Sequence, residues 1–143
     1  MAKCTMKLPE DLLKKLSQLG NKMDTISESV LEAGGKVVYD KVKSNLEGVV
    51  SDNATGELVN ALGVTKVRVD KNGDYNVKIG FNEPRKDGTS NAMVANILEY
   101  GKHGQPARPF LKPAKTQSKS ECMNVMKAKL EEEINKLWTY YLK

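Results

Sequence analysis

An apolar stripe in the first third of the chain constrains the fold more than any other feature of the sequence. Apolar residues recur alternately four and three positions apart, without a miss, at Leu12, Leu16, Leu19, Met23, Ile26, Val30, Ala33 and Val37. A repeat of about 3.5 residues places all of them on one side of an α-helix. Pro9 suits the first position of that helix, because its missing N–H costs no hydrogen bond there. The stripe predicts a long amphipathic helix packed on its own domain or against another subunit.

A glycine pair falls near the end of this stripe. After Gly34 and Gly35, a second apolar line passes through Val38, Val42 and Leu46. Because glycine weakens a helix by roughly 1 kcal/mol relative to alanine, we expect a kink at the pair, where the helix bends or restarts.

The clearest local pattern is a β-hairpin. Apolar and polar residues alternate on both sides of Asn72-Gly73, which is typical of paired strands with one apolar face. Asn-Gly also favours a type I′ turn, because both residues accept positive φ angles. The face to be covered by the first helix consists of Val67, Val69, Val77 and Ile79.

Two short helices are expected on either side of this hairpin. Thr55 can cap the first through its hydroxyl, with Leu58, Val59 and Leu62 as its apolar residues and Gly63 ending it. The second spans 92–100, places Met93, Ile97 and Tyr100 on one face, and ends at Gly101 as a left-handed C-cap. Residues 82–91 between hairpin and second helix form an exposed loop.

The chain closes with a second long amphipathic helix, for which Pro113 is a suitable first residue. Its apolar residues recur every three or four positions at Met123, Met126, Leu130, Ile134, Leu137 and Tyr141. The 143 residues match the usual size of one domain. We therefore predict a single α+β domain over 1–143, with a small antiparallel, hairpin-based sheet packed against long N-terminal and C-terminal helices.

The net charge of +5 arises in the second half of the chain, because residues 1–70 hold ten basic and ten acidic residues. No acidic residue lies between Tyr100 and Ser120, whereas this stretch contains Lys102, Arg108, Lys112, Lys115 and Lys119. A run of this kind fits a solvated face, an acidic protein partner or nucleic-acid phosphates. It lacks the interleaved aromatic residues that stack on bases.

Residues for catalysis are scarce. The chain has one histidine, His103, and two distant cysteines, Cys4 and Cys122, which match no metal-ligand spacing. Glu83, Asp87 and Glu99 could assemble a site for metal-dependent hydrolysis only if the fold brings them together. We therefore expect no enzyme, no cofactor and no bound metal.

Residues 101–113 form a proline-rich arm. Pro106, Pro109 and Pro113 keep its backbone out of the helical region, and an apolar pair, Phe110-Leu111, stands between two of them. We expect a rigid docking arm whose apolar pair enters a site on the same or an adjacent subunit. The candidate partner contacts are Arg108, Phe110, Leu111, Lys112 and Lys115.

Three short motifs resemble the siphovirus tail-component family of phages and prophages. They are Thr55-Gly56-x-Leu58 ahead of the hairpin, Glu99-Tyr100-Gly101, and the following run that contains Pro109-Phe110-Leu111 and Pro113. The order of elements from Leu12 to Leu137 also resembles that of the family. The Pro-Ala-Arg-Pro-Phe-Leu run alone is similar to virion-morphogenesis proteins of contractile-tailed phages as well.

The resemblance implies a non-enzymatic structural protein of the phage neck or tail, acting in head-tail joining or tail completion. It implies other neck and tail proteins as partners, and a ring-forming homo-oligomer in the particle whose isolated subunits can remain monomeric. It further implies a place in the virion, after assembly in the host cytoplasm, and no membrane. The alternative is a basic module that contacts nucleic-acid phosphates through Lys102 to Lys119.

Overall fold

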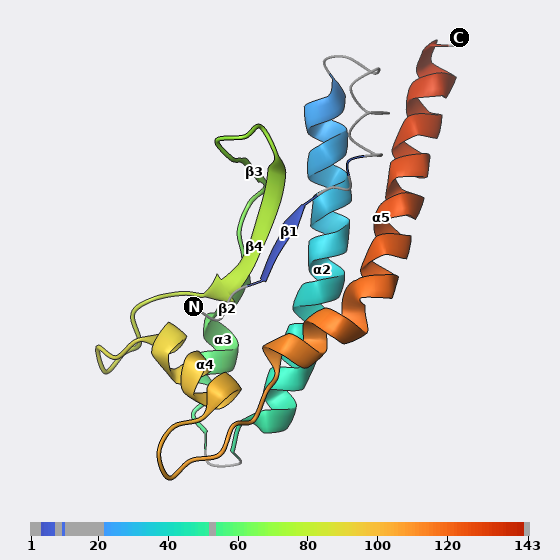
Figure 1. Ribbon diagram of the computed structural model, residues 1–143. Helices are drawn as coiled ribbons and strands as arrows, with labels where there is room; N and C mark the ends of the chain where they lie inside the picture. Colours follow the sequence, from blue (N-terminus) through green and yellow to red (C-terminus); the bar gives the residue numbers. More distant parts are fainter. Residues whose placement is uncertain (1–3, 8–9, 11–21, 52–53, 142–143) are drawn as a thin grey trace.

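The computed structural model describes residues 4–7, 10, 22–51 and 54–141 (Figure 1). It has the predicted α+β layout, in which a small antiparallel sheet packs against long helices. The elements in chain order are β1 (Cys4–Lys7), α2 (Met23–Val49), α3 (Glu57–Ala61), β2 (Leu62–Val64), β3 (Arg68–Val69), β4 (Tyr75–Phe81), α4 (Asn91–Tyr100) and α5 (Leu111–Tyr141).

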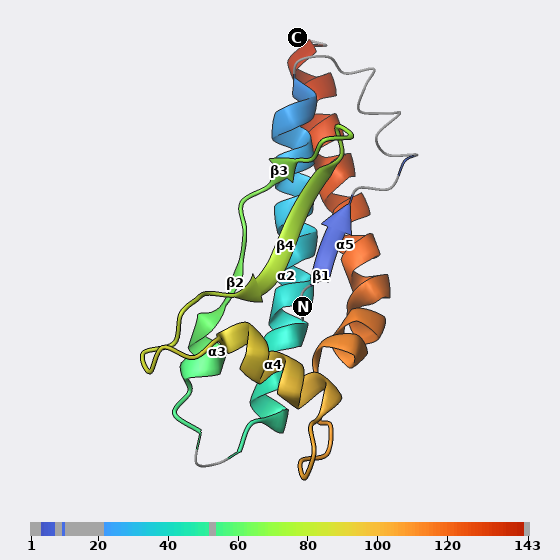
Figure 2. The same ribbon diagram turned by 60° about the vertical axis from the view of Figure 1, so that its left-hand side comes forward.

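Helix α2 is the centre of the molecule. It runs antiparallel to α5 on one side and packs against the sheet on the other, so it lies between them (Figures 1 and 2). Ile26 and Val30 of the first apolar line and Val38, Val42 and Leu46 of the second are all buried. Both lines therefore enter the core, as their periodicity predicts.

Of the two forms of the predicted kink, the restart is wrong, because α2 continues through Gly34 and Gly35 without interruption, and the bend stays a prediction. Close packing explains the second glycine of the pair, Gly35. A Cβ atom on Gly35 would lie 3.3 Å from Val77 Cγ1 on β4, and the Cys122 thiol of α5 donates to the Gly34 carbonyl at 3.5 Å. The predicted helix start at Pro9 and the first stripe residues, Leu12 to Leu19, lie outside the described residues.

Strand β4 is the centre of the sheet. It pairs with β1 along one edge and with β2 and β3 along the other, all antiparallel (Figure 2). The sequence reading missed β1 and β2. It assigned Leu62 to the end of the first short helix, but that helix, α3, ends at Ala61, and Leu62 pairs with Phe81 instead. Strands of three or four residues are too short to show an alternating pattern.

The hairpin prediction is correct in part. Val77 and Ile79 are buried, but Val69 is 57% exposed on β3, a strand of only two residues whose pairing within the described part of the chain is with β4 alone. The type I′ turn is also wrong, because that turn needs a positive φ at Asn72, and among the residues that the structure describes only glycines have a positive φ. The turn instead has three residues closed by Asp70, whose N–H donates to the Asp74 carbonyl at 2.9 Å.

The packing at Gly35 yields a test with a matched control. Gly35→Leu should lower the free energy of unfolding by about 1–3 kcal/mol, because the new side chain overpacks the contact with β4. Gly48→Leu in the same helix should raise it by about 0.5 kcal/mol through helix propensity, since nothing lies within 4 Å of a Cβ there. Urea denaturation followed by circular dichroism measures both changes. Equal effects would contradict the close approach.

Candidate functional site

The sequence motifs meet at one end of the molecule, where α3, α4 and the start of α5 lie together (Figure 2). Thr55, Gly56 and Leu58 stand at the beginning of α3, and Glu99 to Gly101 at the end of α4. Gly56 is the N-cap residue of α3, and the Thr55 hydroxyl accepts the Glu57 N–H at 3.4 Å. The arm between α4 and α5 completes this end.

Glu99 joins α4 to α5. Its carboxylate is buried, with 5% of the residue exposed, and it accepts the backbone N–H groups of Phe110 and Leu111 at 2.9 Å and of Lys112 at 3.0 Å. An anion here satisfies donors that a helix start leaves without partners and complements the helix dipole. Glu99 is therefore the N-terminal cap of α5, which begins at Leu111, two residues before the predicted start at Pro113.

Gly101 turns the chain into the arm. Its φ is 77°, as predicted for a C-cap, but its ψ of 176° lies outside the left-handed helical region, in backbone space that is almost restricted to glycine. A Cβ atom would also lie 2.8 Å from the Ala107 nitrogen. Reciprocal backbone hydrogen bonds between Lys102 and Gln105, at 3.0 and 2.9 Å, then close a turn with the exposed His103 at its tip.

The rest of the arm is fastened to its own chain. The Arg108 N–H donates to the Leu98 carbonyl at 2.6 Å, and its guanidinium donates to the Val49 carbonyl at 3.4 Å. That carbonyl belongs to the last residue of α2, where a cation also suits the helix dipole. The Asn45 amide of α2 also donates to the Phe110 carbonyl at 3.3 Å, so α2 and α4 both hold the arm.

Phe110 occupies a site in its own chain. It is fully buried, and its ring lies edge-on to Phe81 with centroids 6.2 Å apart and planes at 76°, a favourable aromatic arrangement. The sequence predicted a docking site on the same or on an adjacent subunit, and Phe110 occupies the one in its own subunit. Leu111 is half-buried beside the core. Arg108, Lys112 and Lys115 are exposed.

The apolar residues of α4 predicted to share a face lie largely on its outer side. Met93 is 61% and Tyr100 is 75% exposed, and Ile97 is half-buried. The inner face consists of Asn91, Ala95 and Glu99, which follow one another at intervals of four. The helix is thus turned so that its polar cap residue faces inward and its larger apolar residues remain accessible.

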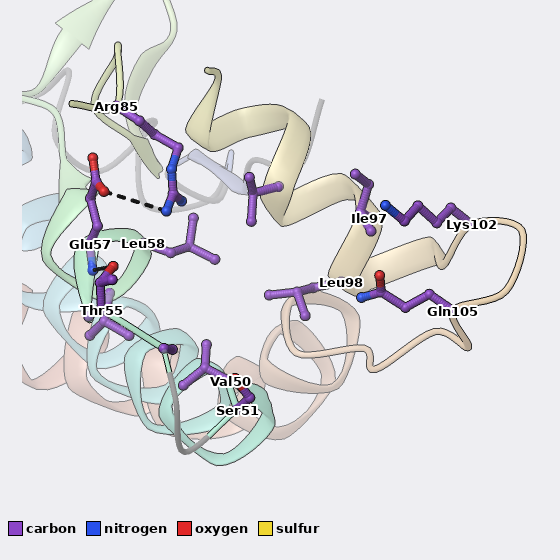
Figure 3. Close-up of a pocket in the computed structure, with 14 residues that line it drawn as sticks. Val50, Ser51, Thr55, Glu57, Leu58, Arg85, Ile97, Leu98, Lys102 and Gln105 are labelled. Carbon is purple, nitrogen blue, oxygen red and sulfur yellow. Dashed lines mark hydrogen bonds and ion pairs between the residues drawn. The ribbon is translucent and has the colours of Figure 1, made fainter. Parts of the chain in front are cut away.

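A groove with a volume of about 460 Å³ lies between α3, α4 and the arm (Figure 3). The Glu57–Arg85 ion pair, at 3.5 Å, stands at one end, and the side chains of Lys102 and Gln105 extend over the other (Figure 3). Its apolar lining is Val50, Leu58, Val59, Val94, Ile97 and Leu98. Sequence reasoning missed the groove, because its walls come from segments that are distant in the chain.

The three carboxylates considered for metal-dependent hydrolysis have separate structural roles. Glu83 accepts the Asn91 and Ala92 N–H groups at 2.9 and 2.6 Å at the start of α4, and these bonds, the one from Ala92 most of all, lower the pKa of Glu83. Hydrogen bonds from Thr89 lower the pKa of Asp87. Glu99 caps α5, whose start adjoins the opposite end of α4.

The described part of the chain holds no cluster of three or more His, Cys, Asp or Glu residues that could bind a metal. Cys122 is buried in the core, where its thiol donates to the Gly34 carbonyl. None of the helices described has the length and apolarity that crossing a membrane requires. The basic residues between Tyr100 and Ser120, which are Lys102, Arg108, Lys112, Lys115 and Lys119, are all exposed.

The Glu99 cap can be tested against Glu121, an exposed acid within α5. Glu99→Ala should lower the free energy of unfolding by about 2 kcal/mol or more, because three N–H groups lose a charged acceptor in a buried place. Glu121→Ala, at an exposed position of α5, should stay within about 0.5 kcal/mol of the parent. Guanidinium denaturation compares the two. Similar midpoints would show that the cap contributes little.

Gly101 and Gly104 form a second matched pair, since both have a positive φ of 77–78° but only Gly101 touches other backbone. Gly104→Ala should cost about 1 kcal/mol of backbone strain. Gly101→Ala should cost more than about 2 kcal/mol, because the added methyl group also collides with the arm. Thermal unfolding by calorimetry gives the difference. Equal losses would argue against a tight arm.

Comparison with known families agrees with this architecture. Residues 10–101 match the model of a family described as "Bacteriophage HK97-gp10, putative tail-component". The match includes the Thr55-Gly56-x-Leu58 and Glu99-Tyr100-Gly101 motifs and ends before the Phe110-Leu111 pair. Comparison with curated proteins and with solved structures finds no match. The matched segment covers more than half of the 143 residues, so the chain belongs to the HK97-gp10-like family of bacteriophage tail components.

Proposed function

We propose that this tail component is a non-enzymatic neck or tail-completion protein that acts in head-tail joining by adding subunits onto a ring or tube. The proposal rests on one observation, that the arm between α4 and α5 is held rigidly against its own chain. Glu99 and Phe110 fix it from inside, while Arg108, Lys112 and Lys115 remain exposed on its outer side. A surface held in this way loses little conformational entropy when a neighbour binds.

The charge of this surface selects the neighbour. Exposed cations at the rim of an interface accelerate association with an acidic surface and disfavour basic ones. The partners we propose are other neck and tail proteins of the same particle, with further copies of this chain completing a ring. Isolated subunits can remain monomeric until a partner supplies the template. Assembly would take place in the cytoplasm of the bacterial host.

Contact with DNA is the second candidate, favoured by the exposure of every cation from Lys102 to Lys119. Phosphate contacts would make affinity fall steeply with salt. Retention on a double-stranded DNA column at low salt, lost by about 200 mM, would support this role. Failure to bind DNA at low salt would exclude it.

Charge reversal tests the assembly role. Lys112→Glu/Lys115→Glu should leave the fold intact, because both side chains are exposed, yet lower the yield of infectious particles about tenfold or more when it replaces the parent protein in the phage. The control is Lys71→Glu/Lys127→Glu, with the same change in net charge at exposed positions elsewhere. It should give the parental titre. A normal titre from the arm variant would refute the proposed contact.

A further inference from the structure

We infer that the groove between α3 and α4 binds an apolar segment flanked by acidic residues, supplied by a different protein of the particle. The groove and its rim are defined by Val94, Ile97 and Leu98 on α4, Val50 and Val59 opposite, and Lys102 at one end. The inference rests on the proposed assembly role, and it adds a binding site and the chemistry of its partner.

The apolar character of the surface indicates a protein ligand. All five apolar side chains named above are only half-buried, although they could pack fully if another chain covered them. The surface continues beyond the groove onto Met93 and Tyr100, 61% and 75% exposed on the same helix. A groove that continues into exposed apolar residues with a polar rim is typical of a docking site.

The charged residues at the rim of the groove indicate which residues should flank the apolar segment of the partner. Glu57 is already engaged, because it pairs with Arg85 at 3.5 Å and accepts the Lys86 N–H at 2.7 Å. At the other end, Lys102 is exposed and extends over the groove (Figure 3). In the described part of the chain no carboxylate forms an ion pair with it. An acidic residue on the incoming segment would supply one.

The groove is formed before any partner arrives. One wall is α4, which Ser90 caps at its start through the Met93 N–H and which Glu99 fixes at its end. The turn at Lys102 and Gln105 is closed by its own backbone hydrogen bonds. A preformed groove avoids the cost of ordering on binding.

A second copy of this chain fits the groove less well. Two copies that met through their α4 surfaces would bring both basic arms together, and the chain carries a net charge of +5. Like charges facing each other across an interface are costly. A different and acidic protein meets the same apolar surface without this repulsion.

Site-specific photo-cross-linking in cells that assemble the phage tests the inference. A photoreactive phenylalanine analogue replaces Met93 or Tyr100, which extend the apolar rim of the groove along α4, or Val69, 57% exposed on β3, as a control. We expect particle-dependent cross-links from the two rim positions, mapped by mass spectrometry to an apolar peptide with flanking Asp or Glu in another particle protein. Cross-links to a second copy, to nucleic acid or to a peptide without acidic residues would overturn the inference.

Charge reversal then tests the role of Lys102. Lys102→Glu should lower the cross-link yield from position 93 about fivefold or more, and lysine in place of the acidic residue on the mapped peptide should restore it. No loss, or loss without rescue, would overturn the inference. If the protein enters particles but the rim cross-links no more than Val69 does, only the groove is refuted. If the protein never enters particles, the proposed function fails as well.

Discussion

The buried carboxylate of Glu99 is the contact on which this end of the molecule depends. A buried charge is costly unless donors surround it, and here three consecutive N–H groups at the start of α5 do so. One ionic cap thereby sets the distance between α4 and α5 and holds Phe110 in the core. The conformation of the arm depends on this contact, because Glu99 fixes both ends of the arm while the prolines restrict the backbone between them.

The same contact decides which face of α4 points outward. Glu99 must face α5, and residues at intervals of four share a helix face, so Ala95 and Asn91 face inward with it. Met93 and Tyr100 are then left on the accessible side. Hydrophobicity alone predicts the opposite orientation. We infer that the hydrogen bonds of the buried Glu99 carboxylate stabilise the fold more than burial of Met93 and Tyr100 would. These two side chains therefore remain exposed and are available to a partner.

The sequence predicted the elements whose side chains repeat with a regular period. It missed the short strands and the contacts between residues that are far apart in the chain. Val30 and Val42 were assigned to the core because their spacing is periodic over many turns, and β4 because seven residues alternate. Strands β1 and β2, which the sequence did not predict, hold only four and three residues, and both pair with β4. The role of Glu99 involves residues eleven to thirteen positions later, for which no local pattern exists.

The short motifs that resemble the tail-component family act on the backbone rather than on a reacting group. Gly56 begins α3 with a φ of 78°, Gly101 admits the arm at a distance that excludes a side chain, and Glu99 caps a helix. Each fixes geometry, and none leaves a nucleophile or a ligand set exposed. Motifs of this kind fix a shape on which exposed residues of this chain, such as Lys102 and Lys112, can present positive charges to a neighbour. A chain whose motifs fix shape in this way is consistent with the proposed assembly role, because a rigid surface loses little conformational entropy when a neighbour binds.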